Sequence, residues 1–206
     1  MRGEKRIGIP TVYRGVRFRS RLEAKWAAFF DIFRWKWEYE PFDLDGWIPD
    51  FALNNAHEVL VEVKPTCSID GFDIPKMFNA VLDSTKEGLD LLLLGQTLVS
   101  PSPWDDEVEL GIGWLGEWPN WSGNDGILKG AHGKGPIVKG WWFGRAVMMQ
   151  DDGIGFSHEE ANRWNRITGE EDKSEEGDLH RYYPDGEALQ RLWGHAGATV
   201  QWRGQV

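Results

Sequence analysis

The stretch GWIPDFALNNAHEVLVEVKP, residues 46–65, predicts two β-strands joined by a short turn. The first strand covers Trp47 to Leu53, where aromatic and apolar residues favour extended backbone. Asn54-Asn55 is a turn signal, and the residues from Glu58 to Lys64 then alternate in the pattern of a second strand. The stretch therefore predicts a pair of strands that return on each other, around which the neighbouring elements can be placed.

Charged side chains fall at special positions of these two strands. In the second strand, alternation puts Glu62 and Lys64 on the same face, away from the valines. In the first strand, Pro49 lacks an amide hydrogen and requires an edge, a bend or a bulge, which would help turn Asp50 toward a site. Two carboxylates and a lysine in this arrangement can hold a divalent metal beside a phosphodiester and activate a water.

The residues before this stretch predict a helix from Ser20 to Phe33. Apolar residues recur there at helical spacing and form one stripe, made of Leu22, Trp26, Phe29, Phe30 and Phe33. Glu23 lies at the edge of that stripe, within reach of a site beside the helix. Glu23 also completes the capping-box pattern of residues 20–23, so a purely structural role is the alternative.

Further elements on both sides complete an expected α/β core. Residues 35–44 predict a strand that forms a hairpin with 47–53 through the tight turn Asp45-Gly46. Residues 73–86 predict a helix and residues 89–96 a buried strand, which implies a right-handed crossover and a parallel pair. Residues 1–100 are thus expected to contain helix, three strands, helix and strand, as a central mixed sheet flanked by helices.

The composition changes after Pro101 and Pro103. Residues 104–206 are rich in Trp and Gly and are expected to form an accessory region of unknown fold. The sheet is expected to be complete by Gln96, so a chain that ends there should still bind metal. Within the accessory region, residues 108–114 and 140–149 give weak strand signals, residues 157–167 predict a helix capped by Ser157, and residues 182–202 predict a helix and a strand.

The net charge of −10 over 206 residues is divided unevenly. Residues 1–36 hold ten Lys and Arg against three Asp and Glu, a balance of +7, which leaves −17 for the remainder. The basic segment includes Arg14, Arg17, Arg19 and Arg21, which come directly before Glu23. Guanidinium groups suit phosphate oxygens, so these four are candidates for contacts with a nucleic-acid backbone. A solvated helix entry with ordinary surface charge is the alternative.

Composition also excludes several classes of protein. Hydrophobic residues make up 41% of the chain, which favours a folded domain over disorder. No apolar run reaches the roughly 20 residues of a membrane-spanning helix, so no membrane partner is expected. The N-terminus is charged and lacks an apolar signal core, and the single Cys67 excludes an internal disulfide and a Cys-rich zinc module. A cytoplasmic location is expected.

On these residues the chain resembles the PD-(D/E)xK nuclease superfamily. The likeness is carried by Pro49-Asp50, followed 12 positions after Asp50 by Glu62-Val63-Lys64, with the helix start at residues 19–23 and the strand at residues 37–41 upstream. The likeness covers residues 13–96 and does not extend to residues 104–206. Within the superfamily the chain is similar to small phage- and transposon-type members and, more loosely, to resolvases that cut branched DNA.

The resemblance implies a restriction-endonuclease-like core and a metal-dependent deoxyribonuclease, an endonuclease of phage or mobile-element DNA processing. Asp50 and Glu62 would be direct ligands of Mg2+ or Mn2+, together with the backbone carbonyl of Val63. Glu23 would act through a metal-bound water or a second metal. Lys64 would orient the attacking water or help to deprotonate it. The products would carry a 5′-phosphate and a 3′-hydroxyl, and a phage-encoded enzyme would work in the host cytoplasm.

Two other interpretations remain open. In the first, the chain is a catalytically inactive DNA-binding or assembly subunit that keeps the nuclease fold. In the second, residues 104–206 bind a second copy of the chain or a recruiting protein, and the nuclease half acts only when it is recruited. Titration with Mn2+ separates the first interpretation from a nuclease, because a scaffold need not bind metal.

Overall fold

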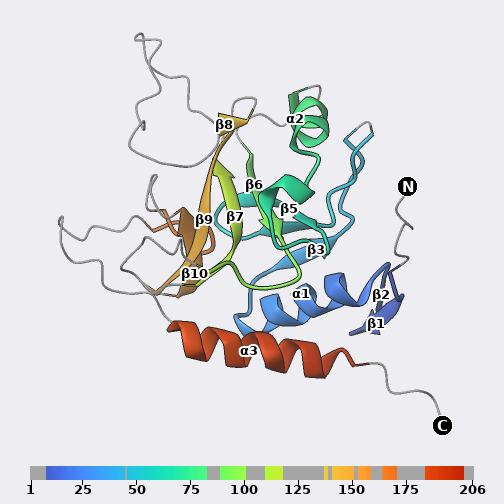
Figure 1. Ribbon diagram of the computed structural model, residues 1–206, viewed down its shortest axis with the longest axis vertical. Helices are drawn as coiled ribbons and strands as arrows, with labels where there is room; N and C mark the ends of the chain where they lie inside the picture. The colour runs from blue at the N-terminus through green and yellow to red at the C-terminus, as the bar shows by residue number, and fades with distance from the viewer. Residues whose placement is uncertain are drawn as a thin grey trace, which may run out of the picture.

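The computed structural model describes residues 8–44, 46–82, 89–100, 110–117, 137–138, 141–150, 153–158, 164–170 and 184–201. The fold is mixed α/β, with helices packed on a central mixed sheet (Figure 1). The sheet contains β3 (Trp37–Tyr39), β4 (Phe51–Asn54), β5 (Glu58–Val63), β6 (Asp90–Leu94), β7 (Gly111–Glu117), β8 (Ile137–Val138), β9 (Trp141–Gln150) and β10 (Ile154–His158). The remaining elements are β1 (Thr11–Tyr13), β2 (Val16–Phe18), α1 (Arg21–Ile32), the 3-10 turn η1 (Ile69–Gly71), α2 (Ile74–Leu82) and α3 (Gly186–Thr199).

Seven strands of the sheet follow one another in the order β10-β9-β7-β6-β5-β4-β3, and β8 pairs with β9 outside this path. β3 pairs with β4 and β4 pairs with β5, both in antiparallel register, which confirms the predicted hairpins. β5 and β6 are parallel, as the crossover through α2 predicted. The three remaining steps, from β6 through β7 and β9 to β10, are antiparallel again. The sheet is therefore mixed because of one βαβ connection.

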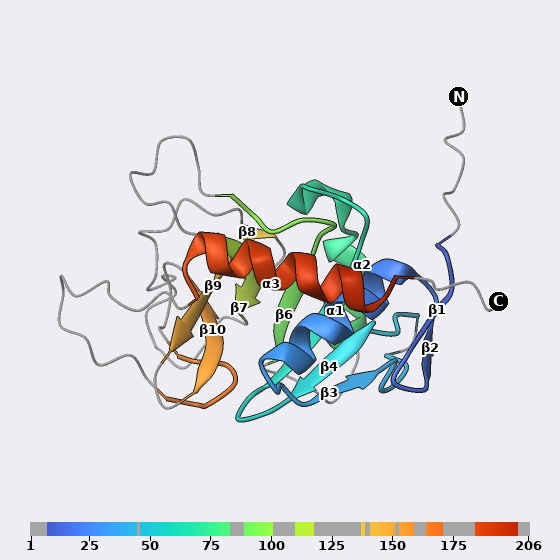
Figure 2. The same ribbon diagram turned by 90° about the horizontal axis from the view of Figure 1, so that it is seen from below.

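Two helices cover one face of the sheet, and α2 lies against the other (Figures 1 and 2). α1 and α3 pack side by side, where the rings of Trp26 and Trp193 have their centroids 4.2 Å apart. Phe51 belongs to the core between these helices and the sheet. Met77 of α2 packs with Leu60 in a second core on the opposite face. The sheet thus has an apolar core on each side.

The helix predicted over residues 20–33 is α1. Ser20 is its N-cap, with an oxygen that accepts the N–H of Glu23. The predicted apolar stripe faces the sheet, since Trp26, Phe29 and Phe30 are fully buried. The buried stripe fixes the rotation of the helix, and this rotation holds Glu23 against the strands at the start of the first turn.

A short hairpin before α1 was not predicted. β1 and β2 pair in antiparallel register, with Tyr13 opposite Val16. The two residues between them have positive φ, 47° at Arg14 and 81° at Gly15, as two-residue hairpin turns of this kind require. Arg-Gly is a weaker signal for such a turn than Asn-Gly, and each strand is only three residues long. The hairpin contains Arg14 and Arg17 of the basic segment and leads directly into α1.

The expectation that the sheet is complete by Gln96 is wrong. β6 pairs with β7, so the sheet continues into the second half of the chain. Leu115, Phe156 and Trp193 belong to the same buried core as Trp26. The described part of residues 104–206 therefore shares one sheet and one core with the first hundred residues, and the weak strand signals at 108–114 and 140–149 correspond to β7 and β9.

The helix expected from Ser157 is also wrong, because Ser157 and His158 end β10. The backbone of a residue in a paired strand forms hydrogen bonds with the neighbouring strand. Ser157 is such a residue, so it does not act as a helix cap, although serine favours that position. The helix predicted within 182–202 is α3, and no strand follows it in the described part of that segment. Among the residues that the structure describes, no helix is long and apolar enough to cross a membrane.

Candidate active site

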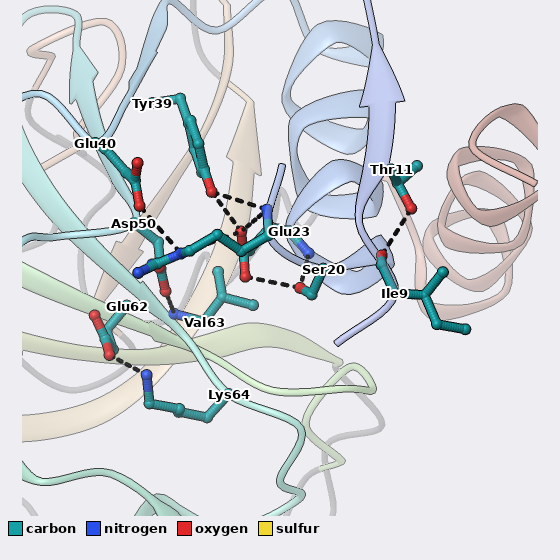
Figure 3. Close-up of polar contacts among 11 residues, drawn as sticks. Ile9, Thr11, Ser20, Glu23, Tyr39, Glu40, Asp50, Glu62, Val63 and Lys64 are labelled. Carbon is teal, nitrogen blue, oxygen red and sulfur yellow. Dashed lines mark hydrogen bonds and ion pairs between the residues drawn. The ribbon is translucent and has the colours of Figure 1, made fainter. Parts of the chain in front are cut away.

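Three carboxylates line up across adjacent strands at one end of β3, β4 and β5. Tyr39 lies opposite Phe51, and Phe51 lies opposite Val61. One step further along the same registers places Glu40, Asp50 and Glu62 side by side, and the Glu40 N–H donates to the carbonyl of Asp50 at 3.1 Å. Arg19 contacts both Glu40 and Asp50, and the charge of Glu62 acts on Asp50, so the three carboxylates are close in space. In Figure 3 the Asp50 side chain lies between those of Glu40 and Glu62, and Glu62 is joined to Lys64.

Asp50 is almost completely buried, with a relative accessibility of 2%. Its Oδ2 accepts the backbone N–H of Val63 at 2.7 Å, and its Oδ1 pairs with the guanidinium of Arg19. Burial and the nearby charge of Glu62 raise the pKa of Asp50 to about 7. Asp50 therefore lies close enough to Glu62 for the charge of Glu62 to disfavour the ionised form of Asp50.

Glu62 is also buried and has two partners. Its Oε2 accepts the indole N–H of Trp47 at 2.9 Å, and its Oε1 pairs with the ammonium of Lys64. The ion pair confirms that Glu62 and Lys64 share one face of β5, as the alternation predicted. Trp47 was not recognised from the sequence as part of the site, although it begins the strand predicted over residues 47–53.

Glu23 reaches the same region from the start of α1. It accepts hydrogen bonds from the hydroxyl of Ser20 at 2.8 Å, from the hydroxyl of Tyr39 at 2.7 Å and from the backbone N–H of Arg19 at 3.1 Å. Burial and the hydrogen bond to Glu23 raise the pKa of Tyr39. The charge of Glu23 also contributes to the raised pKa of Asp50, so Glu23 both caps the helix and faces the site.

Glu23→Gln separates these two roles. Gln offers one acceptor oxygen to the three donors around this position, so a loss of about 1–2 kcal/mol in unfolding free energy is expected. If Glu23 also supplies charge to the site, the rate of DNA cleavage should fall well beyond what this loss of stability explains. Melting curves and cleavage rates of the same preparation measure both. Cleavage at the wild-type rate would leave Glu23 with the capping role alone.

The four candidate arginines occupy different environments. Arg14 pairs with Asp31 at 3.2 Å, whereas Arg17 and Arg21 are exposed. Arg19 pairs with Glu40 at 3.0 Å as well as with Asp50, and lies 4.0 Å from Glu23. The charges of Asp50, Glu23 and Glu40 raise the pKa of Arg19 against the opposing effect of burial. Arg19 thus lies among the carboxylates, which its place in a basic segment did not indicate.

The donor set suits a hard divalent cation such as Mg2+, which prefers carboxylate oxygens. In the described part of the chain, no three His, Cys, Asp or Glu residues are arranged as a metal-ligand group. Arg19 pairs with one oxygen of Asp50, and Lys64 pairs with one oxygen of Glu62. Val63 contacts Asp50 through its N–H, and the role as metal ligand that the resemblance implies for its carbonyl stays a prediction. By the chemistry of their donors Asp50 and Glu62 suit a hard cation, while in the structure each carboxylate has one oxygen in an ion pair.

Comparisons of the chain with protein-family models, with curated proteins and with solved structures give no match. A buried pair of carboxylates, an adjacent lysine and a nearby third carboxylate form a polar cluster at one end of β3, β4 and β5. Such a cluster is costly for folding, because buried carboxylates lose hydration, and clusters of this kind are frequent at functional sites.

Proposed function

We propose that the chain is a metal-dependent deoxyribonuclease of the PD-(D/E)xK type, an endonuclease of phage or mobile-element DNA processing. The observation that carries the proposal is the position of Asp50 next to Glu62 across β4 and β5, with Lys64 on the same face as Glu62. A restriction-endonuclease-like core is part of the same proposal. It is supported by the order of α1, three antiparallel strands, α2 and the parallel strand β6.

Each residue has a distinct part in the proposed reaction. Asp50 and Glu62 would hold Mg2+, or Mn2+ as a substitute, together with the Val63 carbonyl. When bound, the metal stabilises the negative charge that develops at phosphorus and makes a bound water more acidic. Lys64 lies beside Glu62, where its ammonium can orient the attacking water and offset charge on the phosphate. Glu23 would add negative charge from α1, held in place by Tyr39 and Ser20.

The exposed arginines of the basic segment are proposed to bind DNA phosphates. In the double variant Arg17→Ala, Arg21→Ala, the slope of log affinity against log salt should become shallower by about 0.9 for each lost phosphate contact on duplex DNA. The matched control is Arg34→Ala, Lys36→Ala, which removes the same charge at the far end of α1, where both residues are exposed. Equal slopes for the two double variants would contradict phosphate binding at Arg17 and Arg21.

A panel of labelled DNA substrates tests the activity directly. Duplex, branched, single-stranded and end-containing molecules are incubated with the protein and Mg2+ or Mn2+, with Lys64→Ala as the control. Cleavage of at least one substrate, dependent on metal and lost in Lys64→Ala, is the expected result. Cleavage that persists in chelator or in Lys64→Ala would point to a contaminant or to another site.

One observation favours the alternative of a catalytically inactive DNA-binding or assembly subunit. Asp50 and Glu62 are each paired with a basic side chain, so the cluster is partly neutralised without a metal. A site that has lost its catalytic role could keep these ion pairs because they stabilise the folded protein. The two functions differ in one measurable property, since the subunit would bind DNA without binding Mn2+ at Asp50 and Glu62.

A further inference from the structure

The two central carboxylates are held in the same asymmetric way. One oxygen of each accepts a hydrogen bond from a donor that is fixed in the fold, the Val63 N–H for Asp50 and the Trp47 indole for Glu62. The other oxygen of each pairs with a long basic side chain that reaches solvent. The fixed donors orient the carboxylates, and the basic side chains occupy the oxygens that a cation would take.

Of the two basic side chains, Arg19 is the better placed to occupy the position that a bound metal cation would take. Its guanidinium contacts Asp50 and Glu40 and lies near Glu23, so it faces three negative groups. Its backbone N–H is fixed by hydrogen bonds to Glu23 and to the Tyr39 hydroxyl, both at 3.1 Å. Its side chain is 58% exposed. The main chain is anchored, while the exposed side chain leaves room for the guanidinium to turn toward solvent once its contact with Asp50 is broken.

We propose that Arg19 occupies the cation position at Asp50 and is exchanged for the divalent metal when the metal binds. This inference rests on the proposed metal site. In the metal-free protein, Arg19 lowers the electrostatic cost of the buried Asp50 carboxylate. When it leaves Asp50, Glu40 remains as its partner at the edge of the site, 3.0 Å from Nε. Metal binding therefore has to break one charge-assisted pair, which weakens the apparent metal affinity.

The exchange predicts that removing Arg19 strengthens metal binding. Isothermal titration with Mn2+, without DNA, is carried out on the wild-type protein, on Arg19→Gln and on Arg34→Gln. Arg19→Gln should bind Mn2+ roughly tenfold more tightly, the scale of one charge-assisted hydrogen bond. Arg34→Gln removes the same charge from an exposed residue just beyond the C-terminal end of α1, and should change the affinity by less than about twofold at physiological salt.

A second measurement follows the stability of the same proteins. Without metal, Arg19→Gln should melt below the wild-type protein because Asp50 loses its partner. With saturating Mn2+ it should gain more in melting temperature than the wild type gains, since ligand stabilisation grows with affinity. If Arg19→Gln does not fold, Arg19→Lys replaces it in the titration, because a lysine lacks the planar fork that bridges two carboxylates. Arg19→Lys should also bind Mn2+ more tightly than the wild type.

The outcomes separate this inference from the proposed function. If the wild type binds Mn2+ and the Arg19 variant binds it equally or less tightly, the exchange is wrong and the metal site stands. If none of the proteins binds Mn2+, the proposed metal site fails and the exchange fails with it. If only the Arg19 variant binds Mn2+, Arg19 blocks the position in the wild type instead of giving way to the metal, so the exchange is wrong and the wild-type protein has no metal site there.

Discussion

Asp50→Asn is expected to lower the rate of DNA cleavage by at least about a thousandfold at saturating Mg2+. The substitution removes one of the two charges that would hold the metal, yet keeps an oxygen that can accept the Val63 N–H. The initial rate on the best DNA substrate measures the effect. Asp70→Asn makes the same chemical change at an exposed residue of η1 and should cleave at the wild-type rate.

The stability of the same variant shows whether the lost activity comes from lost folding. Burial and the charge of Glu62 raise the pKa of Asp50 to about 7 from its ordinary value of 3.8. The wild-type protein therefore loses unfolding free energy as pH rises through about 7, because the folded state then has to give up a proton that it binds more tightly than the unfolded state does. Asn carries no charge, so this loss does not occur.

In chelator above pH about 7, Asp50→Asn should thus be more stable than the wild type, by about 1–3 kcal/mol. The difference should shrink as the pH falls toward 4, where Asp50 is protonated. Denaturant unfolding at two pH values measures it. A variant that instead unfolds would show that Asp50 is needed mainly as the partner of Arg19, and its inactivity would then say nothing about a metal.

A chain that ends at Gln96 is expected to fail to fold. It would lose β7, β9, β10 and α3, and with them Leu115, Phe156 and Trp193 from the main core. Loss of a single buried Phe or Trp side chain costs about 3–5 kcal/mol, so several together exceed the whole stability of a typical domain. The strand β6, with its four leucines, would also become an exposed apolar edge, which promotes aggregation.

The matched control is a chain that ends at Gln201, which keeps α3 complete. It should be soluble and melt cooperatively, whereas the shorter chain should be insoluble or lack the near-ultraviolet dichroism of packed aromatic residues. The single substitution Trp193→Ala, which removes the contact with Trp26, should cost about 3–5 kcal/mol by itself. A soluble, cooperatively folded chain ending at Gln96 would show that the second half is dispensable for the core.

The sequence predicted those elements whose apolar residues recur at a regular spacing within the element. The stripe of α1, the alternation of β5 and the crossover through α2 each depend on residues within one or two elements. The neighbourhood of Asp50 and Glu62 was predictable for the same reason, because a short turn between two strands leaves few registers. Lys64 follows Glu62 by two residues in a strand, which places both on one face.

The partners of the carboxylates could not be predicted because they come from far along the chain. Arg19 meets Asp50 across 31 residues, Tyr39 meets Glu23 across 16 and Trp47 meets Glu62 across 15. No sequence period joins such pairs. Arg19 has the same local signature as the exposed Arg17, so only the packing of α1 against the strands distinguishes their roles.

The extent of the sheet was missed for a similar reason. β7 joins β6 in antiparallel register, and which strands of a sheet become neighbours depends on packing over the whole domain. Pro101 and Pro103 resemble a boundary by composition, yet the strands on either side of residues 101–109 belong to one sheet. The hydrophobic faces of α1 and α3 have to be buried together, and this requirement joins the two halves of the chain.

Titration of the protein with Mn2+ tests most directly whether Asp50 and Glu62 form a metal site. The wild-type protein and Glu62→Gln are titrated under the same conditions, and Glu62→Gln keeps a side-chain oxygen for the Trp47 indole. Saturable binding by the wild type, reversed by chelator and lost in Glu62→Gln, is the predicted result. Equal binding by the two proteins, or no binding by the wild type at Mn2+ concentrations that support cleavage, would contradict a metal site at these carboxylates.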